Sequence, residues 1–77
     1  MVEAYVLIQA EVGRAADVAD AVGKIQGVRF ADVVTGPYDV VVRGEAADID
    51  GLGELIVAKV QAVVGVTRTL TCPVLHL

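Results

Sequence analysis

The chain has 77 residues, of which 56% are hydrophobic, and a formal net charge of −4. This length predicts one small domain spanning residues 1–77, and the acidic balance argues against nucleic-acid binding, which needs basic patches. No apolar run approaches the roughly 20 residues of a membrane span, and the single cysteine permits no internal disulfide. We therefore expect a cytoplasmic protein without direct contact to DNA or membrane, whose surplus apolar surface is buried between subunits.

Alternating apolar residues predict a first strand over residues 4–10, with both faces largely apolar. A helix is expected over residues 14–25, because Ala, Val and Ile recur there at spacings of three and four, and Gly27 is expected to end it. Two valine-rich segments, residues 28–34 and 38–43, predict a pair of central strands joined by a tight connection.

The second half of the chain repeats the helix-then-strand pattern. Residues 44–47 form the predicted connection, and Asp48 is a favourable N-cap for a second helix over residues 49–64. Residues 66–74 predict a fourth strand, which Pro73 places at an edge or a terminus because proline lacks an N–H. The order βαββαβ predicts an α+β, ferredoxin-like fold, in which a four-stranded antiparallel sheet carries both helices on one face.

The connection between the two central strands is the main candidate for a small-molecule site. Gly36 can adopt a positive φ, and Pro37 has the fixed φ of a turn. Asp39 follows at a position where a strand alone would prefer an apolar residue. Two interpretations remain open: the carboxylate caps the turn by bonding a nearby backbone N–H, or it holds the ammonium group of a ligand whose carboxylate binds the loop amides.

Few other residues suggest chemistry. His76 is the only histidine and reads as an exposed terminal residue, and Cys72 reads as a buried, inert strand residue without a basic neighbour. The glycines form no phosphate-binding loop, and no metal or cofactor is expected. The alternating threonines Thr67, Thr69 and Thr71 suit a strand, and their hydroxyls are also able to donate to a carboxylate ligand.

Three segments resemble the C-terminal effector domain, or RAM domain, of the Lrp/AsnC family. The run from Thr35 to Asp39 resembles its glycine–any–aromatic–aspartate signature, Asp48 falls where that family starts its second helix, and residues 65–71 resemble its closing glycine–valine and threonine pattern. The family's helix-turn-helix is absent, so DNA binding is not carried over. Pro73 departs from the family pattern in the last strand.

The resemblance implies a RAM/ACT-like effector-binding domain that forms a dimeric α/β barrel by pairing sheet to sheet, with dimers joined into an octamer or a similar ring. It also implies an amino-acid effector bound between dimers. By this resemblance, Gly36, Tyr38 and Asp39 have the ligand-binding role of the family's signature loop. Thr69 and Thr71 are implied less strongly to lie near the site.

The first functional hypothesis is a stand-alone, non-enzymatic module that binds an amino acid and oligomerises. It would take part in transcriptional regulation of amino-acid metabolism by ligand sensing, or by co-assembly with a full-length Lrp/AsnC regulator. The alternatives are a small dimeric α+β barrel enzyme, such as a cofactor-free monooxygenase or isomerase, and a purely structural assembly module without a ligand.

Overall fold

The computed structural model describes residues 1–77 and contains four strands and two helical segments, the second of which changes from α- to π-helical geometry. In chain order the elements are β1 (Val2–Ala10), α1 (Ala15–Gly23), β2 (Val28–Val33), β3 (Val40–Ala46), α2 (Ile49–Glu54), its π-helical continuation η1 (Leu55–Val60), and β4 (Val66–Pro73).

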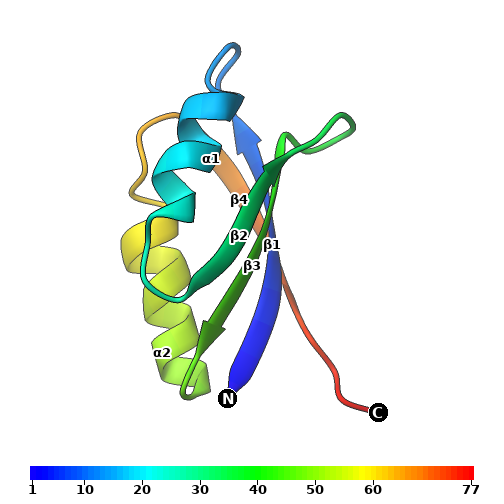
Figure 1. Ribbon diagram of the computed structural model, residues 1–77, viewed down its shortest axis with the longest axis vertical. Coiled ribbons are helices and arrows are strands. Elements are labelled where there is room, and N and C mark those ends of the chain that lie inside the picture. The colour runs from blue at the N-terminus through cyan, green and yellow to red at the C-terminus, as the bar shows by residue number, and fades with distance from the viewer.

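The strands form one antiparallel sheet in the order β2-β3-β1-β4, and both helices cover the same face of it (Figure 1). This arrangement confirms the predicted ferredoxin-like α+β fold. The position of β2 was wrong in the prediction, since β2 is an edge strand and only β1 and β3 are central. The prediction of an edge for the strand that carries Pro73 is confirmed, because β4 forms the other edge.

The core lies between the helices and the sheet. Along β1, the side chains of Ala4, Val6 and Ile8, which the alternation placed on one face, are buried there, and no polar side chain joins them. The core cluster consists of Ala4, Val6, Ile8, Val18, Val22, Val40, Val42, Leu52, Leu55, Ile56 and Val60. Burial of these aliphatic side chains supplies most of the driving force for folding, at about 25 cal/mol per Å² of apolar area.

Both helices are shorter than predicted. The first ends at Gly23, and Gly27 lies beyond it in the turn that leads to β2, where its φ is 98°. The second begins as expected after Asp48, whose Oδ1 accepts a hydrogen bond from the N–H of Gly51 at 2.7 Å. Its continuation η1 ends at Val60 instead of residue 64.

The third strand is displaced along the chain from its predicted range. It starts at Val40 instead of residue 38 and runs through Gly44 to Ala46, so the predicted connection at residues 44–47 is largely strand. Pairing with β1 explains the extension, because the register continues from Ile8 opposite Val40 to Val2 opposite Ala46. None of the helical segments is long and apolar enough to cross a membrane.

The sheet face that points away from the helices, called here the open face, carries both apolar and charged side chains. Its residues include Tyr5, Leu7, Val41, Arg43, Leu70 and Cys72, as the strand register and the alternation of side chains require. Cys72 is exposed on this face, so the expectation that it is buried was wrong.

Candidate ligand-binding site

The loop that was predicted to bind a ligand, residues 34–39 and called here the signature loop, leads from the end of β2 to the start of β3. Gly36 has a φ of 149°, a conformation that side chains disfavour, and a Cβ added there would meet no atom within 4 Å. Backbone conformation alone therefore favours glycine at this position. Tyr38 is half-buried and adjoins Asp39 at the end of the loop.

Asp39 attaches the signature loop to the end of β1. Its backbone N–H donates to the carbonyl of Ile8 at 2.8 Å, and its own carbonyl accepts from the N–H of Val34 at 2.9 Å. The side-chain Oδ2 accepts from the N–H of Ala10 at 2.8 Å, in a half-buried setting. The capping interpretation had assumed a donor within the turn. The donor instead belongs to β1, the neighbouring strand.

A second side chain holds the loop from the same strand. The amide Nε2 of Gln9 donates to the carbonyl oxygen of Pro37 at 3.1 Å. Together the two contacts fix both ends of the sequence from Pro37 to Asp39 against β1. The second carboxylate oxygen of Asp39, Oδ1, accepts no hydrogen bond within the chain and remains available to a ligand.

Thr69 and Thr71 lie on β4, opposite Ile8 and Val6 of β1, and share the helix-covered side of the sheet. Thr69 accepts a hydrogen bond from Nε2 of Gln61 at 2.9 Å. A polar hollow of about 330 Å³ surrounds this contact, lined by Gln61, Val66, Thr67, Arg68 and Thr69. A more apolar hollow of about 300 Å³ lies beside Thr71 and is lined by Ile49, Leu52, Gly53, Ile56, Val57, Gln61, Thr71 and Pro73.

The chain does not bring all five predicted residues together. Asp39 contacts Ile8 from one side, whereas Thr69 pairs with Ile8 from the other. With neighbouring strands about 4.8 Å apart, the backbones of these two residues are separated by about 10 Å. No hollow of the single chain includes Gly36, Tyr38 or Asp39.

Sequence reasoning missed two polar residues beside Thr69. Gln61 contacts Thr69 directly and borders both hollows on this side of β4, and Arg68 offers a guanidinium group at the polar one. The available signal was local: Gln61 is the only polar residue in the apolar run from Val60 to Val66.

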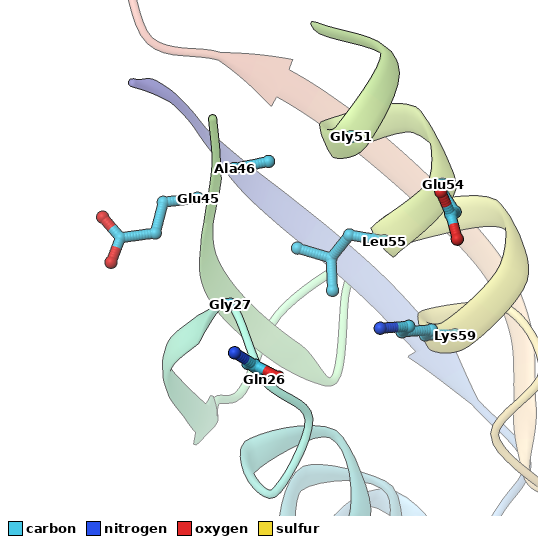
Figure 2. A pocket seen from close by; sticks show the side chains of 8 residues that line it. All are labelled: Gln26, Gly27, Glu45, Ala46, Gly51, Glu54, Leu55 and Lys59. Atoms are coloured by element: carbon cyan, nitrogen blue, oxygen red, sulfur yellow. The ribbon is translucent and has the colours of Figure 1, made fainter. Parts of the chain in front are cut away.

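A third hollow, of about 280 Å³, lies at the other end of the sheet and contains none of the predicted residues. It is formed by the turn before β2, the end of β3 and one side of α2 and η1 (Figure 2). Its lining consists of Gln26, Gly27, Glu45, Ala46, Gly51, Glu54, Leu55 and Lys59.

The open face carries a compact charged cluster. Arg43 donates to Oε2 of Glu3 and to the hydroxyl of Tyr5, both at 2.6 Å, and its guanidinium lies 4.7 Å from the centre of the Tyr5 ring. The hydrogen bond from Arg43 lowers the pKa of Glu3, and the same bond raises the pKa of Arg43. His76 is exposed, as predicted, with Nε2 at 3.9 Å from Oε1 of Glu3.

Comparison with known proteins adds a family match. The family model for the Lrp/AsnC ligand binding domain matches residues 3–77. A curated relative, the uncharacterised HTH-type transcriptional regulator PF0250 of Pyrococcus furiosus, is 31% identical over 55 residues. The match covers 71% of this chain and 37% of that relative, so the chain corresponds to a minor part of the longer protein.

Solved structures share the fold over the whole chain. TTHA0845 from Thermus thermophilus is 28% identical, with a TM-score of 0.92 over 100% of this chain and 96% of its own. The transcriptional regulator NMB0573 from Neisseria meningitidis, solved in complex with L-Met, is 18% identical, with a TM-score of 0.85 over 97% of this chain and 50% of its own. At that identity, the second likeness concerns the fold alone.

Proposed function

The chain belongs to the Lrp/AsnC ligand-binding domain family, as its motifs predicted, and we propose that it binds an amino-acid effector at the signature loop and serves transcriptional regulation. The observation that carries the proposal is the carboxylate of Asp39, which is fixed by Ala10 through Oδ2 while Oδ1 stays without a partner. A carboxylate fixed in this way can bind an ammonium group with little loss of side-chain entropy.

The rest of the loop supplies the complementary chemistry. An amino acid carries a carboxylate beside its ammonium group, and backbone N–H groups near Gly36 are suited to receive it, because no side chain at Gly36 blocks their approach. Tyr38 contributes a half-buried aromatic wall. The fold is also that of the regulator NMB0573, which was solved in complex with L-Met.

A neighbouring copy completes the site in this proposal, since one chain leaves the signature loop outside every hollow and separates it from Thr69 and Thr71. The open face provides the first interface, because Tyr5, Phe30 and Leu70 remain 39%, 41% and 47% exposed on one monomer. Two copies pair through these sheets, and dimers join into a higher oligomer. A full-length regulator such as the HTH-type relative is a further partner for co-assembly.

Binding is proposed here in preference to catalysis. The dimeric barrel enzymes considered as an alternative need a polar cavity between helices and sheet, whereas that layer is filled by aliphatic side chains and buries no polar one. The single histidine and the single cysteine are both exposed outside that layer.

A thermal-shift screen with the twenty amino acids tests the proposal. We expect one or a few of them to raise the melting temperature, and we expect Asp39→Asn to reduce that rise while the variant still folds. If none of the twenty amino acids raised the melting temperature, the amino-acid proposal would be overturned and a structural assembly module would remain. An equal response of the wild type and Asp39→Asn would move the site away from the signature loop.

A further inference from the structure

The hollow shown in Figure 2 is remote from the signature loop. Strand β3 starts at Val40, directly after that loop, and ends at Ala46, which lines the hollow. Six residue steps of about 3.3 Å along a strand separate the two positions by about 20 Å. A small molecule in the hollow therefore cannot touch Asp39 of the same chain.

Two opposite charges line this hollow without pairing. Glu54 and Lys59 project from the same helical segment, and neither takes part in any ion pair of the chain within 4.0 Å. Glu45, the other acid of the lining, pairs with Arg29 at 3.5 Å, and its carboxylate points away from the hollow in Figure 2. One ammonium and one carboxylate thus remain for a ligand.

The helix geometry explains why these two charges share one hollow. In an α-helix, residues five apart are rotated by about 140° from each other around the axis. In η1 the N–H of Gln61 donates to the carbonyl of Ile56, five residues earlier, at 2.9 Å, and this wider turn reduces the angle between Glu54 and Lys59. Short π-helical segments occur frequently at functional sites.

The floor between the charges is apolar and partly backbone. Leu55 is 6% exposed, and in Figure 2 its side chain points into the space between η1 and the end of β3. Gly27 and Gly51 add no side chains to the walls, so peptide groups face the hollow there. Gln26 also lines the hollow, and its side-chain amide has no hydrogen-bond partner within the chain.

We propose that this hollow is a second small-molecule site, which binds a small zwitterion whose carboxylate and ammonium groups are separated by a short apolar chain. Lys59 and the amide of Gln26 donate to the carboxylate, and Glu54 accepts from the ammonium group. The apolar chain of the ligand covers Leu55. The volume of about 280 Å³ suits a molecule smaller than a drug.

A titration followed by ¹H–¹⁵N NMR tests the site with three four-carbon probes: 4-aminobutyrate, butyrate and butylamine. We expect 4-aminobutyrate to shift the amide signals of Gly27, Gly51 and Lys59 in a saturable way. Butyrate and butylamine each lack one charge, so each should bind at least about tenfold more weakly. Equal responses to the three probes, or shifts confined to residues 36–39, would overturn the proposal.

Two charge-removing substitutions sharpen the test, because both side chains are exposed and neither makes an ion pair within the chain. Lys59→Gln and Glu54→Gln should each weaken 4-aminobutyrate binding by about tenfold or more. Lys59→Gln should spare butylamine, whereas Glu54→Gln should spare butyrate. The matched control is Lys24→Gln, directly after α1, which removes an exposed lysine that lies outside the hollow. Unchanged binding in both pocket variants would refute the site.

The outcome is independent of the proposed effector function. The amide signals of Gly27 and Gly51 report on the hollow, and those of Gly36 and Asp39 report on the signature loop. Failure of the amino-acid screen together with a positive 4-aminobutyrate titration would remove the first proposal and retain the second.

Discussion

The carboxylate of Asp39 accepts a hydrogen bond from the backbone N–H of Ala10 at 2.8 Å, across 29 positions of the sequence. This contact joins the loop before β3 to the last residue of β1. The same side chain therefore holds the loop in place and leaves one oxygen free for a ligand, so its structural and binding roles can be separated by substitution.

Asp39→Asn and Asp39→Ala should differ in stability and agree in binding. Asparagine retains an oxygen that can accept from Ala10, so we expect the free energy of unfolding to fall by less than about 1 kcal/mol. Alanine leaves that N–H without its partner and should cost about 1–3 kcal/mol. Both substitutions should lower the affinity for the amino-acid effector by about ten- to a hundredfold. Urea unfolding and calorimetry measure the two effects; full affinity in Asp39→Asn would reduce the carboxylate to a structural contact.

Gly36→Ala and Gly53→Ala should change stability in opposite directions. Both glycines have open space around the position of a Cβ, but only Gly36 has a positive φ, at 149°. Alanine at Gly36 should therefore destabilise the fold by about 1 kcal/mol or more through backbone strain alone. Alanine at Gly53, within α2, should stabilise it by about 0.5–1 kcal/mol. The denaturant midpoints of the two variants measure these changes in stability. Midpoint shifts of the same sign would contradict the prediction.

The pair of Glu3 and Arg43 should make stability depend on acid pH. The pKa of Glu3 is lowered in the folded state, chiefly by the hydrogen bond from Arg43, relative to an ordinary value of 4.5. A lowered folded pKa gives stability that is present above pH 4.5 and is lost as the pH falls through the folded pKa. Glu3→Gln and Arg43→Gln should each reduce the fall in unfolding free energy at acid pH, measured by urea titration. The double variant should reduce it no further. If the unfolding free energy of Glu3→Gln fell with acid pH as steeply as that of the wild type, the assignment would be refuted.

Asp48→Ala should destabilise the domain more than Asp50→Ala. Asp48 caps α2 through its bond from Gly51, and removal of an N-cap costs about 1 kcal/mol. Asp50 lies in the first turn and makes no side-chain hydrogen bond, so only its interaction with the helix dipole is lost, at a few tenths of a kcal/mol. Thermal unfolding of the two variants ranks them, and a larger loss in Asp50→Ala would reverse the interpretation.

Leu7→Glu should convert the proposed dimer to a monomer. Leu7 lies on the open face between Val41 and Leu70 on the neighbouring strands, so a carboxylate there would be buried without a partner when two sheets pack together. Val12→Glu is the control, because Val12 is fully exposed in the turn after β1. Light scattering coupled to size exclusion gives the mass of each. A dimeric Leu7→Glu variant would exclude the open face as the interface.

The sequence predicted those features that depend on neighbouring residues. The alternation along β1 placed Ala4, Val6 and Ile8 together on one face, because successive strand side chains point to opposite sides. The cap at Asp48 followed from its position before an apolar helical stripe. The glycine at position 36 indicated a positive φ in the turn.

Features that depend on distant contacts were out of reach. β2 and β3 are both rich in valine, and only the pairing of β1 with β3 and β4 leaves β2 at the edge. The partner of Asp39 was also hidden, because Ala10 contributes only its backbone N–H, which every residue except proline has. The hydrogen bond from Gln61 to Thr69 likewise depends on how η1 packs beside β4.

The pairing of β1 with β4 joins the strand of this sheet that is synthesised first to the one that is synthesised last. Val66, which begins β4, follows Ala10 by 56 positions. At about 5–20 residues per second, a ribosome needs roughly 3–11 s to make the intervening chain. During that time one edge of β1 has no partner strand within the nascent domain, although three of its side chains belong to the core cluster. Completion of the sheet thus waits until β4 has been made, and the nascent chain depends on that strand to protect β1 from other chains.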